Sequence, residues 1–131
     1  ETVVSEDTPI EEAARIMADN KIGGLPVMRN SGVVGIITET DLFRLMLELT
    51  GAREAGLRAT FLLEDKPGEL AKLTNAVAGK KGNVIAIGTF LGDDQATREV
   101  MMKVGGLEEN VFQEILDQFA TKIKDLRFCC E

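Results

Sequence analysis

Thr38 and Asp41 lie three residues apart and offer the clearest chemistry in the first half of this chain. They follow a β-branched run, Val33–Ile37, which predicts a buried strand, and they precede apolar residues at helical spacing. A helix N-terminus presents free backbone N–H groups, and a hydroxyl and a carboxylate placed there could hold a ribose and its phosphate. The same pair also fits a capping box without a ligand, and taken alone it favours that simpler interpretation.

The elements that must position this pair are predicted from the residues before it. Thr8-Pro9-Ile10-Glu11 predicts a helix start, with Thr8 as the cap and Pro9 at the first helical position, and Asn20 is expected to end that helix. Leu25–Met28 and Val33–Ile37 are predicted to form a hairpin, and residues 2–4 a short strand. The expected order is strand, helix, strand, strand, helix.

Gly24-Leu25-Pro26 at this distance before Thr38-x-x-Asp41 resembles the CBS motif, the repeat named after cystathionine β-synthase, over residues 2 to about 49. The resemblance implies that Asp41 holds ribose hydroxyls, that Thr38 approaches a phosphate and that the residues around Leu25 and Pro26 flank an adenine. The implied nucleotide-binding residues are Gly24, Leu25, Pro26, Thr38, Asp41 and, through a phosphate, Arg44.

The second half of the chain has a different pattern. Apolar residues alternate from Leu57 to Leu63 as in a strand, and further strands are expected at Asn83–Leu91, Thr97–Val104 and Lys122–Phe128. Helical stripes lie between them, the first with Pro67 near its first turn and with Gly82 in a left-handed conformation after its end. This order, β-α-β-β-α-β, predicts a ferredoxin-like antiparallel sheet with both helices on one face.

Asp65-x-Pro67-Gly68-x-Leu70 after the first strand, with Gly82-Asn83-Val84 after the helix, resembles the ACT domain, an amino-acid-sensing module, from about Leu57 to Cys129. The resemblance implies amino-acid binding by Asp65, Pro67, Gly68 and Asn83. Each has a structural alternative, since Gly68 could serve only the turn and Asn83 only backbone groups. ACT domains without a ligand also serve for dimerisation.

Composition excludes several classes of protein. The net charge of −7, without a basic stripe, argues against nucleic acid, and no apolar run is long enough for a membrane span. Histidine is absent, so a His base is excluded, and no metal site, cofactor or enzymatic activity is expected. Cys129 and Cys130 are adjacent and are expected to be free thiols in a reducing cytoplasm.

The predicted fold class is α+β, a partial CBS motif (β-α-β-β-α) in residues 1–50, a linker at 51–56 and an ACT domain in residues 57–131. This order resembles the acetoin-utilisation protein B family, in which two CBS motifs precede the ACT domain. Only one motif is present and the chain starts at Glu1, so we expect a fragment that lacks an N-terminal part.

The resemblances imply a non-enzymatic regulatory sensor. It would bind an adenosyl nucleotide (AMP, ATP or S-adenosylmethionine) at the CBS motif and an amino acid or similar small molecule at the ACT domain. The alternative is an oligomerisation tail of a larger protein, without a working ligand site. In either case the helix after Asp41 has an apolar face that is too wide for one small core to cover. Phe43 and Leu47 add to its main stripe, which consists of Leu42, Leu45, Met46 and Leu49. We therefore expect a homodimer or a larger even-numbered oligomer.

Overall fold

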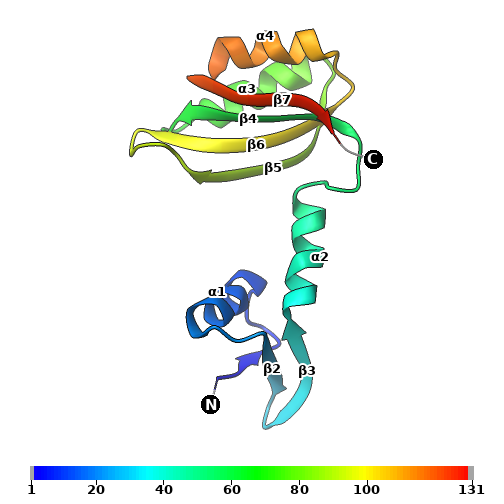
Figure 1. Cartoon of the computed structure of the whole chain (residues 1–131), viewed down its shortest axis with the longest axis vertical. Helices are drawn as coiled ribbons and strands as arrows, with labels where there is room; N and C mark the ends of the chain where they lie inside the picture. The colour runs from blue at the N-terminus through cyan, green and yellow to red at the C-terminus, as the bar shows by residue number, and fades with distance from the viewer. Residues whose placement is uncertain (1, 130–131) are drawn as a thin grey trace. The chain divides into compact units, whose positions relative to one another are not determined.

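The computed structural model describes residues 2–129, which form two compact units, each with its own sheet and core (Figure 1). One unit extends to Met46 and the other begins at Leu47. The fold is mixed α+β, with helices and a separate sheet in each unit, as the sequence predicts.

The first unit has the predicted order of elements. Its bounds are β1 (Val4–Ser5), α1 (Ile10–Asn20), β2 (Gly24–Arg29), β3 (Gly32–Thr38) and α2 (Glu39–Leu49), the last of which runs into the second unit. The sheet order is β1-β2-β3, with β1 parallel and β3 antiparallel to β2. Val4, Ala13, Met17 and Leu25 form the buried core, and Leu42 of α2 packs against it.

The start of α1 differs from the prediction. Pro9 is the N-cap with an extended backbone, and no side chain caps the helix. The Thr8 hydroxyl instead accepts the Ser5 N–H at 3.1 Å. The prediction of a Thr8 cap was wrong because this hydroxyl is used in the turn before the helix. The predicted end at Asn20 is confirmed, and its side-chain amide donates to the Ile16 carbonyl at 2.8 Å.

The second unit is the predicted β-α-β-β-α-β fold. Its elements are β4 (Gly56–Glu64), α3 (Glu69–Gly79), β5 (Asn83–Leu91), β6 (Thr97–Gly105), α4 (Glu109–Phe119) and β7 (Lys122–Cys129). The sheet order is β5-β6-β4-β7, with antiparallel neighbours throughout, and both helices cover one face (Figure 1).

Strict alternation along β4 and β6 separates the two faces of this sheet. Leu57, Ala59, Phe61 and Leu63 of β4 meet Val100, Met102 and Val104 of β6 in the core beneath the helices. Successive side chains of a strand point to opposite faces, so Arg58, Thr60 and Lys103 lie on the helix-free face. The main core cluster therefore lies beneath the helices, while Leu62 and Met101 are buried on the helix-free face.

One of the two turn predictions in this unit was wrong. Pro67 lies near the first turn of α3, as predicted, directly before the N-cap Gly68, which has φ of 89°, and α3 begins at Glu69. Gly82 does not adopt the left-handed conformation, which Lys81 takes with φ of 66°. Gly82 is constrained by space instead, since an added Cβ would lie 2.8 Å from side-chain carbons of Val77 and Leu107.

The segment 51–56, predicted as a linker, is part of the second unit. The division between the units falls inside α2, before this segment. Gly51 and Gly56 are both buried, so the two glycines mark close packing rather than a free tether.

Cys129 also differs from expectation. Cys129 is disulfide-bonded, so the expectation of a free thiol at this position was wrong. The expectation rested only on the geometric difficulty of joining adjacent cysteines. Cys130 lies outside the described residues.

Candidate ligand-binding sites

The junction of β3 and α2 brings Thr38 and Asp41 into direct contact. The Thr38 backbone N–H and its hydroxyl both donate to Oδ2 of Asp41, at 2.9 and 3.0 Å. These bonds lower the pKa of Asp41, the backbone donor contributing most, and Arg44 adds a smaller effect. The result is an ionised, exposed carboxylate at the N-terminus of α2, in the arrangement of half a capping box.

Strand β2 places Gly24 beside this junction. Gly24 is the register partner of Thr38, and Pro26 is the partner of Ile36. An added Cβ at Gly24 would lie 3.2 Å from the Ile37 carbonyl oxygen, so the two strands approach closely here. Gly24 and the Thr38–Asp41 pair therefore form one surface.

Leu25 is buried in the core, whereas Arg44 is exposed near Asp41. Leu25 has no exposed surface and belongs to the core, so the expectation that it flanks a base is not met in this structure. Successive side chains of β2 point to opposite faces of the sheet, and Leu25 lies on the face that packs in the core. Arg44 is exposed, and its charge acts on Asp41 from one turn further along α2.

A hollow of about 490 Å³ in the first unit lies between α1 and α2. Its lining is mainly apolar, with Lys21 and Glu39 as its charged members. No predicted nucleotide-binding residue lines it, but Gly23, Glu39 and Leu42 of its lining are the chain neighbours of Gly24, Thr38 and Asp41. The hollow therefore adjoins the Thr38–Asp41 surface.

In the second unit, a pocket of about 170 Å³ lies where β4 leads into α3. Asp65 lines it, and its backbone N–H is fixed by a 2.8 Å bond to the Ala96 carbonyl. Lys66 forms a 3.2 Å ion pair with Glu64, which raises the pKa of Lys66, with Glu69 adding to the effect. The complete lining is Leu63, Glu64, Asp65, Lys66, Glu69, Leu70, Thr89, Arg98 and Val100. Both charge signs therefore meet in one small pocket.

Asn83 does not share this pocket. Strand register pairs Glu64 with Thr97 at one end of β6 and Asn83 with Gly105 at the other end. The nine residues of β6 separate these ends by about 25 Å. Pro67 and Gly68 lie near the pocket in sequence but do not line it. Of the four predicted amino-acid-binding residues, only Asp65 lines this pocket.

Arg98 and Thr89 are pocket residues that the sequence reasoning missed. The Arg98 guanidinium donates to the Thr89 hydroxyl at 3.0 Å from the neighbouring strand. Arg98 is the partner of Leu63, so it continues the row of core-facing residues on β6. A charged residue in a core-facing row of alternating apolar residues was a signal available in the sequence.

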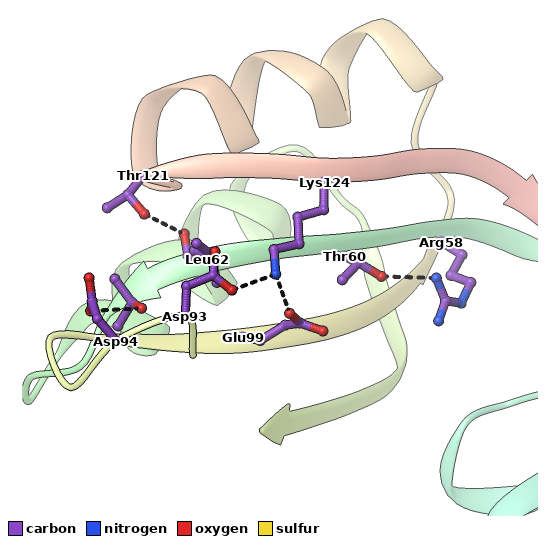
Figure 2. A network of polar contacts seen from close by, with 9 residues as sticks. Arg58, Thr60, Leu62, Asp93, Asp94, Glu99, Thr121 and Lys124 are labelled. Carbon is purple, nitrogen blue, oxygen red and sulfur yellow. Dashed lines mark hydrogen bonds and ion pairs between the residues drawn. The ribbon is translucent and has the colours of Figure 1, made fainter. Parts of the chain in front are cut away.

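The helix-free face carries a polar network that does not resemble a ligand site (Figure 2). Lys124 of β7 donates to Asp93 at 2.8 Å and to Glu99 at 2.7 Å. These contacts raise the pKa of Lys124 and lower that of Asp93. Since each charge already has a partner of opposite sign, the network links β7 to β6 and to the turn before it across β4, which lies between the two strands.

Two family models match the chain. Residues 2–48 match the CBS domain and residues 55–127 match the TTHA0829-like ACT domain. The chain belongs to the TTHA0829-like ACT domain family, with a CBS domain before the ACT domain. These modules indicate a regulatory, ligand-sensing role.

Three curated relatives match the chain over short stretches of 39 to 47 residues. The inosine-5'-monophosphate dehydrogenase of Thermoplasma acidophilum is 49% identical over 39 residues, 30% of this chain and 8% of the relative. An uncharacterized protein of Methanocaldococcus jannaschii is 41% identical over 46 residues (35% and 24%), and a CBS domain-containing protein of Dictyostelium discoideum is 34% identical over 47 residues (35% and 32%). The chain thus spans a third or less of the length of these relatives.

A solved structure described as GqqA, a novel type of quorum quenching acylases, aligns with 56% of this chain and 28% of its own, at 21% identity and a TM-score of 0.41. Within residues 2–129, no helix is long and apolar enough to cross a membrane. The same residues contain no group of His, Cys, Asp or Glu side chains that could hold a metal ion.

We predict that Thr38→Val raises the pKa of Asp41 part of the way toward its ordinary value. The variant removes the hydroxyl donor but keeps the stronger backbone donor. Because the folded-state pKa is lowered, Asp41 stabilises the fold above its unfolded pKa of about 4, and this contribution is lost as the pH falls through the folded value. Carboxyl-carbon NMR titration measures the midpoint. Thr40→Val is the matched control, and identical midpoints in Thr38→Val and wild type would contradict the assignment.

Proposed function

We propose that this chain is a non-enzymatic sensor that binds an adenosyl nucleotide at its CBS motif and an amino acid at its ACT domain. The carrying observation is the ionised Asp41 carboxylate, held by Thr38 at the start of α2 beside Gly24. The order of CBS and ACT modules also fits a cytoplasmic protein of the acetoin-utilisation protein B family. The cytoplasmic location and the membership of this family both stay predictions.

The nucleotide would bind at the Thr38–Asp41 surface. Both Thr38 donors end on Oδ2, so the carboxylate retains its second oxygen for ribose hydroxyls. The positive end of the α2 dipole and the Arg44 guanidinium favour phosphate. Pro26, half-buried on the neighbouring strand, offers apolar surface to a base. A second CBS motif, from a longer chain or another copy, would complete the cleft.

Asp41→Asn is predicted to weaken AMP, ATP or S-adenosylmethionine binding by roughly tenfold, because an amide replaces a charged acceptor of two hydroxyls. Isothermal titration calorimetry measures this change for each nucleotide. Glu48→Gln removes the same charge from an exposed position on the same helix and should leave the affinity unchanged. Equal affinities in Asp41→Asn and wild type would refute the role of Asp41.

The amino acid would bind in the pocket between β4 and α3. A zwitterion needs one anionic and one cationic partner, and Asp65 and Arg98, which both line the pocket, would supply them. Leu63, Leu70 and Val100 add apolar surface, which favours an aliphatic side chain. The ligand would therefore be a small aliphatic amino acid.

A thermal-shift screen of the twenty amino acids is predicted to give a stabilising aliphatic ligand, because binding to the folded state alone raises the melting temperature. Arg98→Gln should abolish the shift. Arg127→Gln on β7, which removes a guanidinium paired with Asp125, should keep it. Asn83→Ala should also keep it, since Asn83 lies at the other end of β6. A screen without any stabilising amino acid would leave the ACT unit with a purely structural role.

A role in oligomerisation is the second candidate, and exposed apolar side chains favour it. No residue of α2 is fully buried, and Phe43 is 60% exposed. On β3, Val33 is 66% and Ile36 is 62% exposed. Exposed apolar side chains in this number are typical of interfaces, and two-fold pairing is the commonest way to cover a self-complementary surface.

We predict at least a dimer in multi-angle light scattering at micromolar concentration. Phe43→Glu should weaken the CBS contact and shift the mass downward on dilution, because it places a charge in an apolar interface. Ser31→Glu, with the same added charge in an exposed turn, is the control. A monomer mass for the wild type across the dilution series would exclude self-association by either unit.

A further inference from the structure

Lys103 is the only charged side chain that is fully buried among the residues described, with 1% of its surface exposed. It lies on the helix-free face of β6, in register with Arg58 of β4 and Ala86 of β5. A buried ammonium is costly unless it is hydrogen-bonded. Neither of the proposed ligand sites includes Lys103, so its burial requires a separate explanation.

The Lys103 ammonium is held by the segment that follows α2. Its Nζ donates to the Gly51 carbonyl at 2.7 Å and to the Glu54 carbonyl at 2.6 Å. This segment is itself bonded to the last turn of α2, since the Gly51 N–H donates to the Glu48 carbonyl and the Ala52 N–H to the Leu47 carbonyl. The ammonium therefore supplies a positive charge just beyond the C-terminal end of a helix, where the dipole favours one.

The two glycines of this segment leave no space between it and the sheet. Gly51 has φ of 62°, and a Cβ there would lie 3.1 Å from the Ile85 side chain. A Cβ at Gly56 would lie 2.7 Å from the Val104 carbonyl oxygen. The backbone thus approaches β5 and β6 more closely than any other residue type would permit.

We propose that Lys103 pins residues 51–56 to the ACT sheet, and we call this arrangement the Lys103 clasp. The clasp joins the last turn of α2 to β6 within the second unit, which begins at Leu47. With the clasp closed, residues 51–56 are fixed to the sheet; with it open, they form a flexible segment. That the clasp transmits ligand signals rests on the proposed function, whereas its existence does not.

Trypsin tests the clasp in the intact chain without any ligand. Arg53 is exposed in the middle of the segment, but a protease needs locally opened backbone to cleave there. Lys103→Met keeps the unbranched apolar stem and removes the ammonium. This variant should be cleaved after Arg53 about tenfold faster than wild type, because two charge-assisted bonds are lost. Amide exchange at Gly51 and Ala52 should accelerate in parallel.

Cleavage after Arg98, inside β6, distinguishes opening of the clasp from general unfolding, since only the latter accelerates both sites. Lys124→Met is the matched control, because Lys124 also makes two bonds on the same face but does not contact the clasp (Figure 2). If Lys103→Met does not fold, Gly51→Ala, which strains the segment from the other side, should accelerate cleavage after Arg53 in the same way. Wild-type cleavage at Arg53 in a folded Lys103→Met or Gly51→Ala protein would overturn the proposal.

Discussion

The pleat of β4 and β6 is the constraint on which the second unit depends. These two strands pair along almost their whole length, and the alternation of their side chains separates the core face beneath α3 and α4 from the helix-free face, which carries Arg58, Thr60 and Lys103. The same alternation places Arg98 at the end of the apolar row, beside Asp65, and Lys103 on the opposite face. A shift of one residue in register would turn Arg98 to the helix-free face and Lys103 to the core face. It would therefore destroy both the pocket and the clasp.

In the first unit, the corresponding constraint is the direct junction between the end of β3 and the start of α2. Strand β3 ends at Thr38 and α2 starts at the next residue, so Thr38 and Asp41 must meet across one helical turn. Their contact stabilises the helix start whether or not a nucleotide binds. Capping and ligand binding are compatible here, because the cap engages one carboxylate oxygen and keeps the carboxyl ionised.

The two units differ in how completely they cover their apolar residues. The ACT unit buries a large core between its sheet and helices, whereas the CBS motif buries only four residues and leaves much of β3 and α2 exposed. Four buried residues provide little hydrophobic stabilisation for a unit of this size. Under both the sensor hypothesis and the oligomerisation hypothesis, the exposed apolar residues of the CBS motif therefore need to be covered by another motif or another copy.

The sequence by itself determined the order of the elements, the two families and the Thr38–Asp41 contact. These features depend on periodicity, on turn residues and on spacings within one helical turn, all of which are local. Tertiary structure decided the rest. Strand register carried Asn83 to the far end of β6 and brought Arg98 to Asp65, while packing placed Leu25 in the core. Gly51 and Gly56 look like linker residues in the sequence, and only the buried Lys103, about fifty positions away, shows that they pack against the sheet. Such contacts join residues that are distant along the chain, and no local pattern encodes which distant partners will meet.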